Sequence, residues 1–359
     1  MGMATTAHLG LLVIHAPHGP SIRTFAFTDP YSYQSTLRGA EIEVLVRAKG
    51  DFRAELTQID LPRLWIQRGR ETLPRIIRGA VSAGRAAISF VTAANQPESH
   101  QCGIVVTPGD VIVNSGSMHN RTEAPCRWGS MSLALDDLVA AGNAVAGRDL
   151  IAPSHACKIR PSGAVMATLL SFHERVEQLG RTAPAKLLHP QVARGIDHAL
   201  VHAMIMCLTE ATPVTPTIGT RHRAAVMAKL EGFLAEHQGR PVYLAEICAA
   251  TGASERTLRA CCREYLGMGV IRYLWLRRMY MAHRALVLGT PATATVTDIA
   301  TDCGFWELGR FSVEYRELFG QLPSATLFRQ PDHRPTAGRC RSAVPRRGRA
   351  EASSGALEF

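Results

Sequence analysis

Two helix-turn-helix patterns joined by one long helical segment constrain the fold of this chain more than any other feature of its sequence. The first pattern runs from Leu244 to Gly267 and the second from Val296 to Gly320. In each, a glycine follows a short helical segment and permits a tight turn, at Gly252 in the first and at Gly304 in the second. The sequence therefore predicts an all-helical unit that contains two versions of the same helix-turn-helix motif.

The second helix of the first pattern separates apolar from basic side chains. Leu258, Cys261 and Tyr265 recur at helical spacing and are expected to face inward, and Ser254 is a natural N-cap. The residues left at the start and on the outer face, which we expect to contact a DNA major groove, are Ser254, Arg256, Thr257, Arg259, Ala260 and Arg263. A solvated basic helix of an ordinary bundle would give the same pattern, but the second copy favours DNA reading.

The second pattern repeats the arrangement with different outer residues. Thr295 is expected to cap a helix from Val296 to Cys303, and after the turn Phe311 and Tyr315 point inward. Val313 lies near the outer face. The outer residues that we expect to contact DNA are Trp306, Gly309, Arg310 and Arg316.

The segment between the two patterns, Val270 to Leu288, predicts one continuous helix that Gly289 and Pro291 terminate. Its 19 residues would form a rod of roughly 28 Å. Successive major-groove faces on one side of B-DNA recur about every 34 Å. The rod therefore has about the length needed to place both outer faces on one duplex. Its apolar positions at spacings of three and four are Ile271, Leu274, Trp275, Met279, Ala282 and Leu286.

This arrangement resembles the AraC/XylS family of bacterial transcription regulators over about 85 residues, near a quarter of the chain. The matching segments are S-E-R-T-L-R from Ser254, I-R-Y-L-W-L-R-R from Ile271, V-T-D-I-A from Val296, and Gly304, Phe305, Arg310 and Phe311. The resemblance implies a DNA-binding regulator. One departure is Gly309, where the family usually has Ser. A Gly lowers helix propensity by roughly 1 kcal/mol and removes a hydroxyl group, so the second unit is expected to read DNA more weakly.

The first 210 residues have a different character. Short runs of β-forming residues, such as those at 41–47, 86–91, 104–107 and 111–113, alternate with turn residues, which favours a sandwich or a barrel. The segment from Pro108 to His119 resembles a degenerate cupin turn. The expected fold class is therefore α+β and multidomain, with an N-terminal cupin-like β-barrel, appended helices, and a C-terminal all-α domain with two helix-turn-helix units.

The expected boundaries follow from these changes in pattern. Residues 20–140 would form the sensory barrel, and residues 160–210 would form helices that either dimerise or pack on the barrel. Residues 211–220, rich in Thr and Pro, would be the linker. Residues 221–330 would hold the paired DNA-binding units, with a disordered basic tail at 331–359. Each side of the linker would have its own apolar core.

No cofactor and no metal are expected. A metal-binding cupin needs a His-x-His upstream with a following Glu, and His100 and His119 stand alone. The nine Cys include no C-x-x-C pair. Trp65 and His119 are the candidates for contact with a small-molecule effector inside the barrel, although single aromatic and His residues in a barrel are usually packing residues.

The net charge of +10 favours a polyanionic partner. Because the chain has no secretory signal and no run of 18 apolar residues, we expect a cytoplasmic protein that does not enter a membrane. The expected function is that of a sequence-specific transcription regulator that binds double-stranded DNA as a homodimer, responds to a small molecule through its N-terminal domain and is not an enzyme. We expect an activator, which would have RNA polymerase as a further partner. The alternatives are a cupin-type enzyme fused to a DNA-binding module and a constitutive regulator whose barrel only dimerises.

Overall fold

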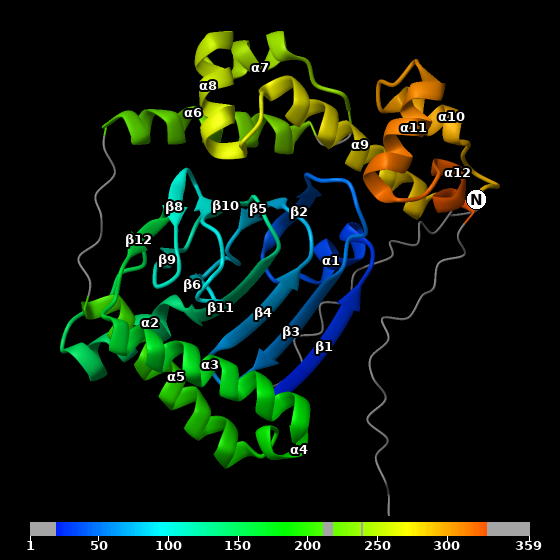
Figure 1. Ribbon diagram of the computed structural model, residues 1–359. Helices are drawn as coiled ribbons and strands as arrows, with labels where there is room; N and C mark the ends of the chain where they lie inside the picture. Colours follow the sequence, from blue (N-terminus) through cyan, green and yellow to red (C-terminus); the bar gives the residue numbers. More distant parts are fainter. Residues whose placement is uncertain (1–18, 211–217, 238–239, 329–359) are drawn as a thin grey trace, which may run out of the picture.

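The computed structural model describes residues 19–210, 218–237 and 240–328. The tail expected at 331–359 lies outside these residues, as does the part of the expected linker at 211–217. Helix α6 (Ile218–Glu236) begins inside the range 211–220, so helical structure starts earlier than the composition of that segment indicates. The described chain is a mixed α+β structure with a sheet-rich N-terminal part and a helical C-terminal part (Figure 1).

Two antiparallel sheets form the N-terminal part. In order, the seven-stranded sheet contains β1 (Ser21–Phe27), β3 (Ala54–Asp60), β4 (Trp65–Glu71), β11 (Cys126–Ala134), β6 (Arg85–Val91), β9 (Val111–Asn114) and β12 (Cys157–Ile159). The five-stranded sheet contains β2 (Ala40–Val46), β5 (Arg75–Ala80), β10 (Ser117–Thr122), β7 (Ser99–Gln101) and β8 (Ile104–Val106). A short helix, α1 (Pro30–Thr36), precedes β2.

The two sheets do not close into the expected barrel. Within the described residues, no strand of one sheet pairs with a strand of the other. The edge strands β8 and β12 are only three residues long, and a barrel needs continuous ladders around its whole circumference. Of the two architectures that the strand pattern favours, the structure is therefore the open, two-sheet one.

Alternation along the strands gives the seven-stranded sheet two different faces. On β11, Met131 and Leu133 are buried under helices, whereas the intervening Ser130 and Ser132 face the other sheet. Strand β6 follows the same rule, because Ser89 lies opposite Ser130 in the antiparallel register. The outer face is therefore apolar, and the inner face carries hydroxyl groups.

Helices cover that outer face (Figure 1). They are α2 (Leu135–Ala146), α3 (Gly163–Thr182), α4 (Pro184–Leu187) and α5 (Pro190–Glu210), and the expected helices at 163–179 and 191–209 are thereby confirmed. On α5, Leu200, Met204 and Cys207 are buried in the core beneath the sheet. Most of the apolar stripe of α5 thus packs within the chain, and Val192 is its exposed apolar residue.

The C-terminal part continues with α7 (Leu244–Thr251), α8 (Glu255–Leu266), α9 (Val270–Leu288), α10 (Val296–Asp302), α11 (Leu308–Phe319) and α12 (Pro323–Leu327). Both expected ends of α9 are confirmed. Ile271, the first of the apolar positions spaced at three and four, is 54% exposed. Its neighbours Val270, Tyr273 and Leu274 occupy the buried positions of the first turns, which leaves Ile271 on the open side.

The expectation of a separate core on each side of the linker is also wrong. One continuous apolar cluster contains Val44, Leu45 and Ile76 of the five-stranded sheet together with the buried side chains of α6 to α12. Polar contacts cross the same boundary, because the Tyr280 hydroxyl on α9 accepts a hydrogen bond from the Val46 backbone nitrogen at 2.7 Å. The helical part therefore rests on the five-stranded sheet, on the side opposite to α2–α5 (Figure 1).

Candidate nucleic-acid interface and ligand pocket

Local capping positions the first candidate DNA-reading helix, α8. Gly252 ends α7 with a positive φ of 66°, a conformation that glycine adopts without the steric cost of a side chain. The Ser254 hydroxyl then accepts a hydrogen bond from the Thr257 backbone nitrogen at 3.2 Å. Leu258 and Cys261 are buried against the rest of the domain. The expected turn, cap and inner face are all confirmed.

The outer face of α8 is open and basic. Arg256, Arg259, Ala260 and Arg263 are exposed and line a shallow surface hollow. Arg259 is paired with Glu255 one turn earlier, whereas Arg256 and Arg263 form no ion pair within the described part of the chain. Two guanidinium groups on this face are therefore available for a phosphate or a guanine edge.

The hydroxyl groups at the start of α8 are already engaged with each other. Ser254 is exposed and Thr257 is half-buried, and their side-chain oxygens lie 2.9 Å apart. Capping thus uses the groups that we expected to contact DNA. Any contact from Ser254 or Thr257 to a phosphate would compete with this hydrogen bond.

The second helix pair, α10 and α11, is built on the same local signals. Thr295 accepts a hydrogen bond from the Asp298 backbone nitrogen at 3.1 Å, and Gly304 has a φ of 79°. Phe311 and Tyr315 are buried. These observations confirm the expected cap, turn and inner face, with α10 ending one residue before the expected Cys303.

The outer face of α11 is less basic in effect than its sequence indicates. Arg310 lies 2.9 Å from Glu314 and 3.8 Å from Glu307, so its charge is largely balanced. Gly309 and Arg316 are exposed. A side chain added at Gly309 would meet open space, which agrees with a position on the outer surface.

Exposed apolar side chains dominate the rest of this face. Trp306 is 76% exposed and Val313 is 60% exposed. Trp306 lies in the turn before α11 and Val313 lies on the helix itself, so both apolar side chains are open to contact with a partner. The sequence signal for Val313 was its position beside Arg310 and Arg316, which alone did not distinguish a DNA contact from a neutral surface residue.

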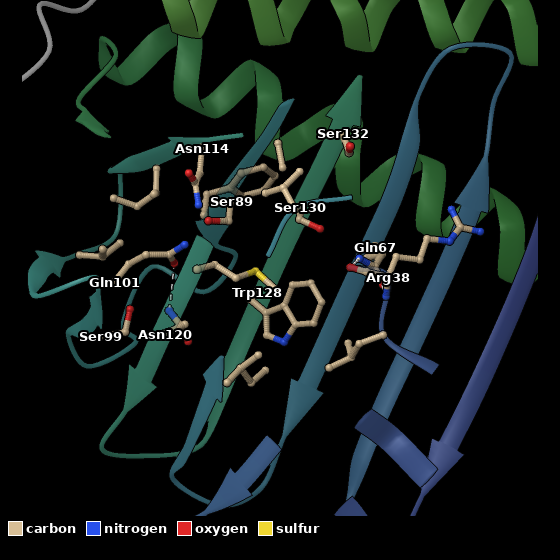
Figure 2. Close-up of a pocket in the computed structure, with 18 of the residues that line it drawn as sticks. Arg38, Gln67, Ser89, Ser99, Gln101, Asn114, Asn120, Trp128, Ser130 and Ser132 are labelled. Carbon is tan, nitrogen blue, oxygen red and sulfur yellow. Dashed lines mark hydrogen bonds between the residues drawn. The ribbon is translucent and has the colours of Figure 1, made fainter. Parts of the chain in front are cut away.

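A pocket lined by both apolar and polar side chains lies between the two sheets (Figure 2). It has a volume of about 140 Å³. Its walls carry hydroxyl, amide and indole groups, of which Gln67, Ser89, Ser99, Gln101, Asn114, Asn120, Trp128, Ser130 and Ser132 are labelled in Figure 2. Sequence reasoning missed nearly all of these residues. The alternating serines at 130 and 132 were the one available signal, because a polar residue at every second strand position marks one face.

Internal contacts neutralise the charged groups near this pocket. The Trp128 indole donates to Glu71 at 2.8 Å, and Glu71 is also paired with Arg75. The Asn120 amide donates to Gln101 at 3.2 Å, a contact drawn as a dashed line in Figure 2. The pocket can therefore contact a ligand through uncharged hydroxyl groups and indole rings.

The two residues that we expected in an effector pocket are separated by the fold. Trp65 lines the pocket between the sheets, with the Arg85 guanidinium over its ring at 3.8 Å from the centroid. His119 does not line this pocket and instead lines a second cavity, on the side of the helical part. Neighbouring residues of β10 point to opposite faces, so Asn120 faces the pocket while His119 faces the helical part.

No group of three or more His, Cys, Asp or Glu side chains among the described residues is placed to hold a metal ion. None of the described helices combines the length and the apolar character that crossing a membrane requires.

Comparison with known proteins agrees with the geometry of the helix pairs. A family model described as a helix-turn-helix domain matches residues 247–329. The "Probable thc operon regulatory protein" of Rhodococcus erythropolis is 32% identical over 166 residues, 44% of this chain and 48% of that protein. The "XylDLEGF operon transcriptional activator 2" of Pseudomonas putida is 32% identical over 95 residues, 26% of this chain and 60% of that protein.

Among solved structures, a probable AraC family transcriptional regulator from Rhodopseudomonas palustris is 33% identical, covering 28% of this chain and 94% of that chain, with a TM-score of 0.26. Fold and sequence together define a protein with a helix-turn-helix domain. The chain belongs to the AraC/XylS family of bacterial transcription regulators. It spans less than two thirds of the length of the two relatives above, 48% of one and 60% of the other.

Proposed function

We propose that this protein is a sequence-specific, DNA-binding transcription regulator. The observation that carries the proposal is the pair of helices α8 and α11, each preceded by a glycine turn and each presenting an open face. The rigid helix α9 joins the two pairs. A duplex is the partner that needs two such faces at a fixed separation.

We assign the main reading role to α8. Arg256 lies in the first turn of the helix, where helix-turn-helix proteins contact base edges, and its guanidinium group can bind guanine through two hydrogen bonds. Arg263 lies nearly two turns further along and is assigned to phosphate. Arg259 and Ala260 complete the contact surface, with Ser254 and Thr257 at its edge.

We assign a weaker role to α11. Arg316 can contact phosphate without breaking an ion pair within the described residues, whereas Arg310 must first leave Glu314 and Glu307. Gly309 contributes no side chain. Trp306 and Val313 supply apolar contacts instead. The two units would thus differ in chemistry as well as in strength.

The N-terminal part would carry the sensing function. Its support is the pocket between the sheets, which combines Trp65, Trp128 and several hydroxyl and amide groups without a free charge among the described residues. A small uncharged effector fits this lining. We also propose that the sheets are cupin-like. The same proposal assigns residues 20–140 to the sensory part, 160–210 to the appended helices and 221–330 to the DNA-binding part.

Homodimerisation and activation of RNA polymerase are further parts of the proposal. Both rest on the family resemblance, and the relative from Pseudomonas putida is itself called a transcriptional activator. Most of the apolar stripe of α5 is used within the chain, so we assign the dimer contact to the remaining exposed surface of α3 and α5.

The test is to map the genomic DNA fragments that the full chain selects at physiological salt. We expect a small set of fragments that share a motif of two half-sites, and we expect Arg256→Ala to change the motif at one base position. Arg148→Ala, a change at an exposed arginine after α2 with no ion pair among the described residues, is the matched control for loss of a positive charge. Equal recovery of all fragments by the unmodified protein would contradict sequence-specific regulation.

A further inference from the structure

A second cavity lies between the five-stranded sheet and α6, outside the pocket between the sheets. It has a volume of about 810 Å³, within the usual range for sites that bind small molecules. The sheet contributes Arg78, Met118 and His119, and the helices contribute Ala228, Glu231 and Tyr265. We call this space the α6 cavity. It joins the N-terminal part to α8, the helix that we assign to DNA reading.

The polar groups at the inner end of the α6 cavity lack partners. His119 is 7% exposed, and neither of its ring nitrogens has a hydrogen-bond partner among the described residues. The hydroxyl group of the buried Tyr265 is also unpartnered there, and the two rings lie 6.5 Å apart. A buried polar group without a partner costs about 1–3 kcal/mol. A ligand that supplied the missing hydrogen bonds would recover part of this cost.

The side of α6 that faces the cavity is made of small residues. Ala224, Ala225, Ala228, Gly232 and Ala235 all line it. The open character of this wall is clearest at Gly232, where an added Cβ would have no atom within 4 Å. The flexible side chains of Met118 and Met227 border the same space and can move aside to let a ligand reach the inner end.

Charges around the cavity disfavour an anion. The Arg78 guanidinium is already paired with both Glu43 and Glu231, and Glu41 also lines the space. Burial, the largest cause, lowers the pKa of His119 to about 4, so the imidazole is neutral near pH 7 and offers one donor and one acceptor. A carboxylate would therefore meet two other carboxylates and find no free cation among the described lining residues.

We propose that the α6 cavity binds a neutral, largely apolar molecule that carries one hydroxyl or primary amide group, which hydrogen-bonds to His119 and Tyr265. The apolar body lies along the alanines of α6 and the two methionines. Such a molecule connects β10 with α6 and α8. The site is separate from the pocket between the sheets, so a protein that failed to bind DNA could still bind this ligand.

The test uses phenol as the probe, with the full chain, isothermal calorimetry at pH 7, and ¹H–¹³C spectra of the histidine rings. Phenol should bind and shift the His119 ring signals. Toluene, which lacks the hydroxyl group, and benzoate, which is an anion, should each bind at least about fivefold more weakly, the factor that corresponds to the loss of one hydrogen bond. Equal binding of benzoate would overturn the proposed ligand class.

Two variants and one control locate the site. Ala228→Leu fills the cavity from an exposed helix position and should weaken phenol binding by about tenfold or more, because a branched side chain occupies the ligand space. Tyr265→Phe should weaken it by about fivefold. Ser130→Ala, in the pocket between the sheets, should leave it unchanged. Phenol binding that persists in Ala228→Leu, that is lost in Ser130→Ala, or that is absent from the unmodified protein would overturn the proposal.

Discussion

The Nε2 atom of His283 on α9 lies 2.8 Å from Oδ1 of Asp29, the N-cap residue of α1. The other ring nitrogen of His283 lies 2.6 Å from the Tyr315 hydroxyl on α11, and the Phe319 ring stacks on the imidazole at a centroid distance of 4.2 Å. A carboxylate near the start of the chain is thus connected to the scaffold of the second helix pair. The contact joins residues that are 254 positions apart in the sequence.

This contact predicts a pH-dependent contribution to stability. Burial raises the pKa of Asp29, but the hydrogen bond and charge of His283 and the hydrogen bonds from Ser32 together hold that pKa below its usual value. The stabilisation is therefore present above the unfolded-state pKa, about 4, and is lost as the pH falls through the lower folded-state value. Asp29→Asn keeps an N-cap oxygen and should lower the free energy of unfolding by about 1–2 kcal/mol at pH 7.

Urea unfolding between pH 3 and pH 7 measures this effect. The difference between Asp29→Asn and the unmodified protein should shrink as the pH falls below about 4. Exposed Asp149, which lies on the far side of the sheets, provides the matched control Asp149→Asn. A difference for Asp29→Asn that stayed constant with pH would mean that its charge contributes nothing.

The two candidate reading helices should respond differently to loss of an arginine. Arg256→Ala should weaken specific DNA binding by about 1–3 kcal/mol and relax the preference at one base pair. Arg310→Ala should cost less, because its guanidinium must first leave Glu314 and Glu307. Titration of labelled operator DNA at several salt concentrations measures both. A larger loss for Arg310→Ala would reverse our assignment of the stronger reader.

The length of α9 should limit the spacing of the two DNA half-sites. Because the helix is a continuous 19-residue rod, one chain should protect two major-groove segments roughly 10 base pairs apart. Inserting five base pairs between them turns the second segment to the opposite side of the duplex and should abolish its protection. If both segments are still protected after the insertion, the connection between the two helix pairs is flexible.

Helix α9 can also be broken directly. Ala282 is fully buried near its middle, and Pro at an interior position costs about 3 kcal/mol and kinks the helix. Ala282→Pro should therefore abolish specific binding, with circular dichroism to confirm that the protein remains folded. A folded variant that still protects both segments would contradict the rigid-spacer hypothesis.

The exposed valine of α11 should recognise thymine through its methyl group. An apolar side chain in the major groove can contact this methyl group, which uracil lacks. Replacing the contacted thymine with uracil should weaken binding by about fourfold, equivalent to about 0.8 kcal/mol for one methyl group. In Val313→Ala the same replacement should have little effect. If uracil weakens binding equally in both proteins, Val313 is not the residue that reads the base.

Local signals in the sequence were sufficient to predict the turns, caps and helices of the two helix-turn-helix patterns. Gly252 and Gly304 adopt the positive φ that their turns require, and Ser254 and Thr295 cap the helices that follow them. The C-terminal end of α9 follows from Gly289 and Pro291. These features depend on backbone sterics and on hydrogen bonds between residues a few positions apart, so a short stretch of sequence contains all the information.

Contacts between distant segments decided the rest. The openness of the two sheets, the core shared by the five-stranded sheet and α6–α12, and the exposure of Ile271 depend on which surfaces meet after folding. The surroundings of His119 also depend on such contacts. Strand alternation places its side chain on the other face of the sheet from that of Asn120, but only the docking of α6 and α8 forms a cavity around it. The sequence by itself determined where helices and turns begin and end, through short-range sterics and capping. Only the tertiary structure decided which side chains share a cavity, a core or an ion pair, because those interactions join residues that the sequence keeps far apart.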